Sequence, residues 1–144
     1  MYSKQHFLIS VLVGVAVAVL AGMTLPLAVA TVGYAAVLGV GVDFDHFLVA
    51  RLNTGRWDAL IGVIRNPRRA FLDQEDIFEE GKDVTKIQRL LSHVVLGGLL
   101  VAVLYPFLPY FAVVSAVVLY VHVLCDLYQD VRDEAEARSP HGRL

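Results

Sequence analysis

The chain has 144 residues, of which 57% are hydrophobic and 18% are charged, and its net charge is −2 with histidine neutral. A soluble domain of this length carries more charge, so the composition favours an integral membrane protein with a single domain over residues 1–144. The charge gives no support to a nucleic-acid partner. The single cysteine, Cys125, excludes an internal disulfide and any CxxC metal or redox motif.

The first apolar stretch, residues 7–42, contains thirty-six residues and no Asp, Glu, Lys or Arg. Pro26 lies near its middle, and proline cannot donate to a helical hydrogen-bond ladder, so it marks a turn. Since one crossing needs about 20 residues, we expect transmembrane helices over 6–25 and 27–42. Small residues at 27–30 resemble a signal-peptidase site, but the apolar sequence is too long and continues beyond it, which favours a retained anchor.

Small residues recur every four positions in the first predicted helix, at Gly14, Ala18 and Gly22. This spacing permits close contact between helices in a membrane. We expect the contact within the bundle, and the alternative is a dimer interface.

The central segment, residues 43–85, is charged. Trp57, Leu60, Ile61 and Ile64 recur at helical spacing, which predicts a short helix lying in the membrane interface or, alternatively, packed on the ends of the bundle. Residues 73–83 are acidic, and we expect a solvated loop or a fragment of helix there, without chemistry of its own. Residues 85–88 have the spacing of a capping box that opens the next helix.

The second apolar stretch, residues 90–125, also has thirty-six residues and no acidic or basic side chain. Pro106 and Pro109 lie near its middle and predict a turn between helices at 86–105 and 109–128, followed by a tail at 129–144. Backbone in lipid must satisfy its own hydrogen bonds, which these lengths allow only as helices. The predicted fold is therefore all-α, with four transmembrane helices arranged as two hairpins.

The basic residues predict the orientation of these helices. Of the 12 Lys and Arg residues, Lys4 precedes the first helix, eight lie between residues 43 and 89, and three follow the last helix. The two hairpin turns contain none. By the positive-inside rule, both termini and the central segment are expected on the cytoplasmic side of the cell membrane.

This topology places acidic and histidine side chains at the cytoplasmic helix ends. His122 and Asp126 are four residues apart on one helical face, and Asp43 and His46 share a face if the second helix persists. Carboxylates at helix C-termini are disfavoured by the helix dipole and repel one another, and a divalent cation reverses both effects. The predicted metal ligands are Asp43, Asp45, His46, His93, His122 and Asp126.

Mixed imidazole and carboxylate ligands suit zinc, manganese or iron better than calcium, and zinc or manganese fits best. Each residue alone also has a simpler interpretation: a histidine can bond a backbone carbonyl, and Asp45 can cap a helix that begins at His46. The terminal histidines, His6 and His141, are expected in solvent. Cys125 lies off the stripe formed by His122 and Asp126 and is expected to pack.

Three short elements resemble the family of small inner-membrane proteins described as membrane-bound metal-dependent hydrolases, the LexA-regulated, YdjM-like group. They are "DFDH" at 43–46, "QRLLSH" at 88–93 and "HVLCD" at 122–126. The resemblance implies a metal-dependent hydrolase. The chain departs from the family at Gln88 and Ser92, where the family has His and Thr, so either a second metal position is weakened or His93 alone serves.

The function expected from these residues is hydrolysis of a phosphoester or lipid-like substrate at the cytoplasmic membrane face, with one or two divalent ions. Arg89 is the candidate for binding an anionic substrate group, and its alternative role is to extend toward the lipid interface. A second interpretation is a non-enzymatic membrane protein in which the cluster is a structural metal or polar site. Ion or proton transport is disfavoured, because the outer half of each hairpin has no ionisable group.

Overall fold

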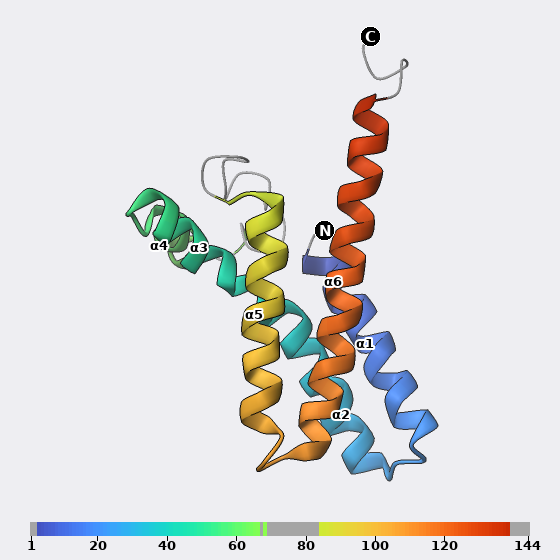
Figure 1. The fold of residues 1–144 in the computed structure, drawn as a ribbon. Coiled ribbons are helices and arrows are strands. Elements are labelled where there is room, and N and C mark those ends of the chain that lie inside the picture. Colours follow the sequence, from blue (N-terminus) through green and yellow to red (C-terminus); the bar gives the residue numbers. More distant parts are fainter. Residues whose placement is uncertain (1–2, 67, 69–83, 139–144) are drawn as a thin grey trace.

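The computed structural model describes residues 3–66, 68 and 84–138, and no β-strand occurs among them. This confirms the all-α fold class for the described part of the chain, whereas the acidic residues 73–83 and His141 lie outside it. In chain order (Figure 1), the helices are α1 (Ser3–Leu20), α2 (Leu25–Gly41), the short 3-10 helix η1 (Val42–Phe44), α3 (Asp45–Thr54), α4 (Asp58–Arg65), α5 (Lys86–Leu104) and α6 (Pro109–Arg138).

The helices form two pairs, α1 with α2 and α5 with α6, whose connecting turns lie at the same end of the molecule (Figure 1). Helix α6 also contacts α1 and α2, so it is the central element. We call the opposite end the charged end; it comprises the first turns of α1 and α5, the helices η1 and α3, and α6 from His122 onward.

Three helices are long and apolar enough to cross a membrane by length and composition: Leu25–Thr54, Lys86–Leu104 and Pro109–Arg138. Helix α1 is apolar but shorter. The exterior of the bundle carries many exposed Leu, Val and aromatic side chains, whereas six of the eight largest fully buried side chains are polar. An apolar exterior around a polar interior indicates a membrane protein.

The first turn differs from its prediction, because Gly22 forms it instead of Pro26. Gly22 has φ 59°, and the backbone N–H groups of Gly22 and Met23 donate to carbonyls of the last turn of α1 at 3.1 Å, which is the Schellman arrangement. Pro26 lies in the first turn of α2, where a backbone N–H would have no intrahelical acceptor. The first helix, predicted over 6–25, was therefore placed too late along the chain, and the second, predicted over 27–42, begins two residues before its predicted start.

Two helices also extend beyond their predicted ends at residues 42 and 128. Helix α2 continues through η1 into α3 because the junction residues keep right-handed helical backbone angles. Helix α6 continues to Arg138, and its polar extension contains i,i+4 pairs between Arg132 and Glu136 at 2.8 Å and between Glu134 and Arg138 at 3.5 Å. Such pairs and the helix-forming residues around them support a helix outside lipid.

Small residues let α1 lie directly on α2. A Cβ added at Gly14 would be 3.0 Å from the Ala35 Cβ, and one added at Gly39 would overlap the Ser10 side chain. Gly14 thus makes the helix–helix contact that the small-residue spacing predicted, and it makes it within the bundle. Gly22, the last residue of the predicted pattern, forms the turn instead. The close approach at Gly39 brings the first turns of α1 next to the end of α2.

Helix α4 confirms the short helix predicted after Trp57. Trp57, at the N-cap of this helix, is 42% exposed, and Ile61 and Ile64 within it are 42% and 68% exposed; Val63 is its buried residue. The predicted apolar face is therefore not covered by the described ends of the bundle.

Candidate metal centre

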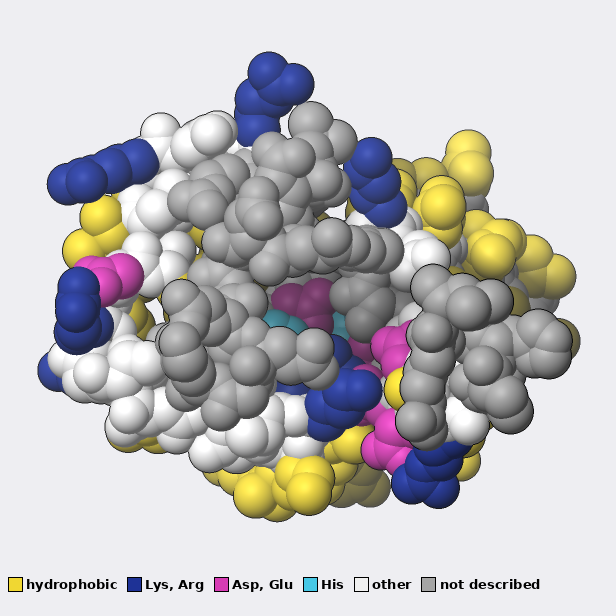
Figure 2. All heavy atoms as spheres, turned by 90° about the horizontal axis from the view of Figure 1, so that it is seen from above, with side chains coloured by type: hydrophobic (Ala, Val, Ile, Leu, Met, Phe, Trp, Pro, Cys, Tyr) yellow, Lys and Arg dark blue, Asp and Glu magenta, His cyan; other side chains and the backbone are white. Residues whose placement is uncertain are grey.

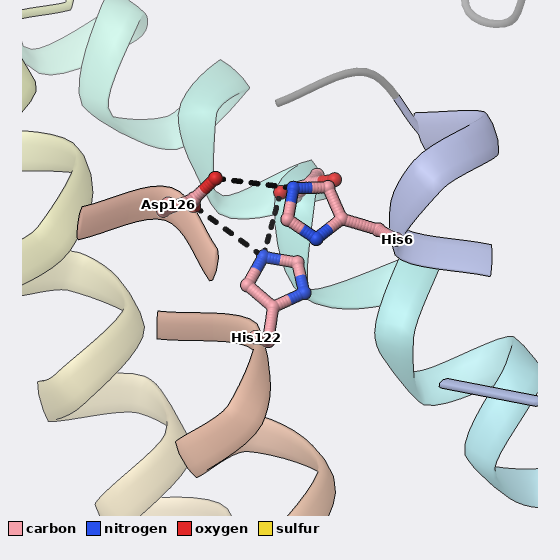
Figure 3. A group of neighbouring side chains, drawn as sticks. His6, His122 and Asp126 are labelled. Carbon is pink, nitrogen blue, oxygen red and sulfur yellow. Dashed lines mark hydrogen bonds and ion pairs between the residues drawn. The ribbon is translucent and has the colours of Figure 1, made fainter. Parts of the chain in front are cut away.

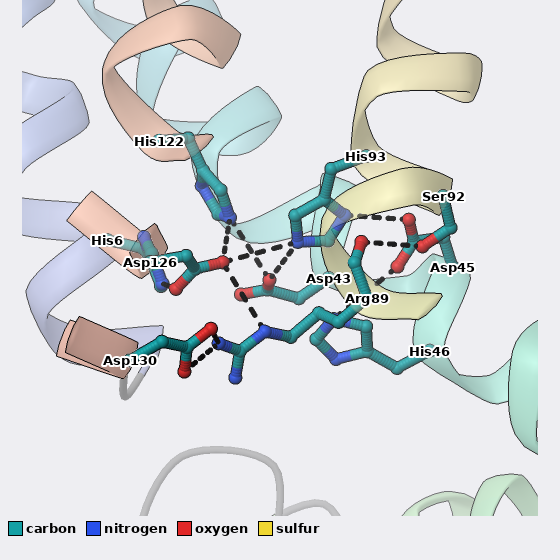
Figure 4. A network of polar contacts seen from close by, with 10 residues as sticks. All are labelled: His6, Asp43, Asp45, His46, Arg89, Ser92, His93, His122, Asp126 and Asp130. Atoms are coloured by element: carbon teal, nitrogen blue, oxygen red, sulfur yellow. Dashed lines mark hydrogen bonds and ion pairs between the residues drawn. The ribbon is translucent and has the colours of Figure 1, made fainter. Parts of the chain in front are cut away.

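The charged end contains a buried cluster of carboxylate and imidazole side chains that come from separate helices (Figure 4). Helix α6 provides His122 and Asp126, and α5 provides His93. The continuous α2–η1–α3 segment provides the remaining predicted ligands, Asp43, Asp45 and His46. All six predicted ligands thus lie in one cluster, although they are separated by up to 83 positions in the sequence.

Two carboxylates lie between two imidazoles at the centre of the cluster. Asp43 Oδ1 is 3.4 Å from His93 Nε2 and 3.2 Å from His122 Nε2. Asp126 Oδ2 is 3.5 Å and 3.6 Å from the same two nitrogen atoms. Ligands at 2.0–2.1 Å from a zinc ion in a tetrahedron are about 3.4 Å apart. All four separations match that spacing.

The central nitrogen atoms are available to a cation. The Nε2 atoms of His93 and His122 are buried and make no hydrogen bond to any residue that the structure describes. A buried polar atom without a partner is energetically unfavourable, and a bound cation would satisfy both nitrogens. The donor set therefore fits a divalent metal ion such as zinc or manganese.

Asp45 holds His93 from the other side of its ring. Asp45 Oδ2 is 2.7 Å from His93 Nδ1. A carboxylate accepts only, so Nδ1 carries a proton, and Nε2 is the nitrogen that would bind a cation at the centre. Asp45 therefore lies behind His93, apart from the atoms that face Asp43 and Asp126. Its alternative role as a helix cap is wrong, since no side-chain cap bond precedes α3.

His6 belongs to the cluster, and the prediction that it lies in solvent is wrong. Its side chain is 2% exposed, and its Nε2 is 3.1 Å from Asp126 Oδ1. Figure 3 shows its ring parallel to that of His122, with ring centroids 3.8 Å apart. Helix α1 begins at Ser3, before the predicted start at residue 6, so His6 is held by helical residues on both sides. The signal in the sequence was a histidine at the charged end of the first helix.

Arg89 and Asp130 border the cluster toward the charged end (Figure 4). Arg89 Nη2 is 2.7 Å and 2.8 Å from the two Asp130 oxygens, and Arg89 Nε is 3.8 Å from Asp126 Oδ2. The arginine thus turns toward the cluster and does not extend toward lipid. Asp130 was not among the predicted site residues, although its position four residues after Asp126 put it on the same helical face.

The cluster is open toward the charged end. The side chains of Asp43, His46 and Arg89 are 17%, 16% and 20% exposed, whereas those of His93 and Asp126 are at most 1% exposed. Figure 2, which views this end, shows acidic and histidine side chains at the floor of a hollow with basic side chains beside it.

Gln88, the departure from the family pattern, faces away from the centre. It forms the predicted capping box with Thr85. Its side-chain amide also pairs with Asn53 of α3 at 2.9 Å and 3.1 Å. Gln88 therefore joins α5 to α3. Cys125, which was expected to pack, is half-buried and is not part of the candidate ligand groups found among the described residues.

The described residues offer two overlapping groups of candidate ligands. In each group one ligand atom per residue lies within 4.8 Å of all the others. The groups are His6, Asp43, His122 and Asp126, and Asp43, His46 and His93.

Compared with known proteins, the chain matches no family model, no curated protein and no solved structure at a significant level. The resemblance to membrane-bound metal-dependent hydrolases therefore remains a prediction that rests on the three short motifs, and the geometry of the cluster is the independent support for a metal site.

Proposed function

We propose that this protein is a metal-dependent hydrolase of the cell membrane that cleaves a phosphoester or a related lipid-like substrate at the cytoplasmic face. The observation that supports it is the central arrangement of the cluster, in which two buried imidazole nitrogens without hydrogen bonds face two shared carboxylates. A divalent ion in such a site supplies a nucleophilic water near neutral pH and polarises a phosphoryl oxygen.

The side chains have distinct roles in this proposal. Asp43, His93, His122 and Asp126 hold the ion, and Asp45 fixes the tautomer of His93. Arg89 binds an anionic group of the substrate, because its guanidinium is next to the cluster and partly exposed. Asp130 holds Arg89 in that position through the two short contacts of its carboxylate.

The proposed topology has four membrane crossings with both termini in the cytoplasm. The support is the distribution of Lys and Arg together with the two turns at one end of the bundle (Figure 1). The exposed apolar face of α4 then lies in the cytoplasmic lipid interface. A reporter domain fused after the last residue tests this orientation, and a reporter found outside the cytoplasm contradicts it.

The enzymatic proposal is tested with full-length protein in detergent, charged with Zn²⁺ or Mn²⁺, and assayed on p-nitrophenyl phosphate and on a short-chain lipid phosphate. We expect metal-dependent turnover that Asp126→Asn reduces by at least 100-fold, because it removes a charged ligand; loss of an electrostatic stabiliser at a reacting centre has effects of this order. Arg89→Gln is expected to raise KM more than it lowers kcat.

The control for this assay is Asp58→Asn, since Asp58 is 66% exposed and pairs with Arg56 away from the cluster. Turnover that survives chelation, or that is equal in wild type and Asp126→Asn, contradicts the proposal.

A structural role of the cluster is the second candidate, because its contacts join α1, the α2–η1–α3 segment, α5 and α6. In that role, chelation lowers the unfolding temperature in detergent, and no substrate is turned over under any metal condition.

A further inference from the structure

We infer that the cluster binds two divalent cations, which share the carboxylate of Asp43. The inference rests on the proposed metal centre and adds the number of ions and the class of substrate that such a pair favours. It follows from the two overlapping ligand groups, whose shared residue is Asp43.

The imidazoles are arranged in two pairs on either side of Asp43. His6 stacks on His122 with an interplanar angle of 15°, and His46 stacks on His93 with an angle of 21°. The two pairs meet nearly at a right angle, since the rings of His93 and His122 are 79° apart. Each pair belongs to a different candidate ligand group.

Asp43 is placed to serve both groups. Its Oδ1 is 3.4 Å from His93 Nε2 and 3.2 Å from His122 Nε2, so one carboxylate faces one nitrogen of each pair. A single zinc ion takes about four ligands, whereas six residues of the cluster belong to the two groups. One ion therefore uses only part of this ligand set, whereas two ions can use both groups.

The charges of the cluster accommodate one or two ions. Asp43, Asp45, Asp126 and Asp130 are countered by Arg89 alone, which leaves a net charge of −3 when the imidazoles are neutral. One divalent ion reduces this to −1, and two change it to +1. Uncompensated buried charge is strongly unfavourable, so either number of ions improves on the empty cluster. Only two ions leave a positive centre, which attracts an anion.

A pair of ions favours phosphoesters among the possible substrates. Two-metal centres hold the attacking and leaving oxygens of an in-line displacement at phosphorus. Arg89, beside the centre, adds a further donor for phosphate oxygens. A phosphoester is therefore favoured over a carboxylic ester.

The number of ions is measured on full-length protein in detergent that has been stripped with a chelator and dialysed against Mn²⁺. We expect two manganese ions per chain by mass spectrometry of the metal. His46→Ala and His6→Ala are each expected to retain one ion, and Asp43→Asn is expected to weaken both positions by at least tenfold. Asp58→Asn, on the exposed Arg56 pair, is the control and retains two.

Electron paramagnetic resonance of the wild-type protein gives a second readout, and its wild-type spectrum does not depend on the variants being folded. Two ions that share a carboxylate give an exchange-coupled spectrum, whereas His46→Ala gives the six-line signal of isolated Mn²⁺. Saturation at one ion per chain, or two uncoupled ions, overturns this inference and leaves the proposed hydrolase standing. Binding of no ion overturns both.

Discussion

His93 shows how neighbouring side chains decide what an imidazole does in this bundle. Asp45 accepts a hydrogen bond from His93 Nδ1 at 2.7 Å, so Nε2 is the nitrogen that faces Asp43 and Asp126. A hydrogen bond from the ring nitrogen that does not bind the metal orients a histidine ligand and raises its basicity. The same residue type without such a carboxylate would have no fixed tautomer.

Replacement of Asp45 by asparagine tests this positioning role. Asp45→Asn removes the charge behind His93 but no atom that faces the centre, so we expect metal affinity to fall by about 10–100-fold with unchanged stoichiometry at saturation. Affinity is measured by titration of stripped protein with Zn²⁺, with Asp58→Asn as the control. A lower number of bound ions at saturation would instead make Asp45 a ligand.

The sequence identified most residues of the cluster but not all of them. Two patterns were sufficient to predict the ligands: the i,i+4 spacing of His122 and Asp126, and the acids at the end of the second helix. They were informative because helix geometry fixes which residues share a face. His6 was placed in solvent because it is close to the N-terminus, and hydropathy does not show which side chains of other helices lie beside it. Asp130 was not predicted as a site residue because its contact with Arg89 joins two helices, and the sequence alone does not show such a contact.

At the scale of helices, the contact between α1 and α2 determines whether His6 reaches the cluster. A Cβ at Gly39 would overlap the Ser10 side chain, and the His6 carbonyl oxygen is 3.4 Å from the same point. Glycine is therefore required there by the close approach of the two backbones. Gly33, on the same helix, has no neighbouring atom within 4 Å of an added Cβ.

These two glycines form a matched pair for mutation. Gly39→Val is expected to destabilise the protein by about 1–3 kcal/mol through overpacking and to weaken metal binding, because the first turns of α1, which carry His6, must move away from α2. Gly33→Val is expected to change neither. Both are measured by thermal unfolding in detergent and by metal titration. Equal behaviour of the two variants would show that the α1–α2 contact does not position His6.

The sequence predicted the existence of the helices better than their ends. Hydropathy and the capping box at Thr85 located α5 within a residue at each end. Pro26 was assigned to the turn, although a proline is equally suited to a first helical turn, and Gly22 made the turn instead. The end of α6 was missed because a polar helix continues past the apolar segment, which hydropathy does not detect.

At the scale of the molecule, the bundle has an apolar exterior and polar groups at its interior and charged end. Contacts of the cluster join α6 to α1, to the α2–η1–α3 segment and to α5. If a cation is bound there, its binding energy is coupled to the packing of all four parts, because ligands from separated elements come together only in the folded state.

Thermal unfolding of the stripped protein with and without added metal tests most directly whether this cluster is a metal centre. At a free Zn²⁺ or Mn²⁺ concentration of about 100 times Kd, binding stabilises the folded state by about 2.7 kcal/mol. We therefore expect the unfolding temperature of the wild type to rise by several degrees and that of Asp126→Asn to stay nearly constant. A wild-type unfolding temperature that does not respond to metal, or an equal rise in Asp126→Asn, would contradict the account.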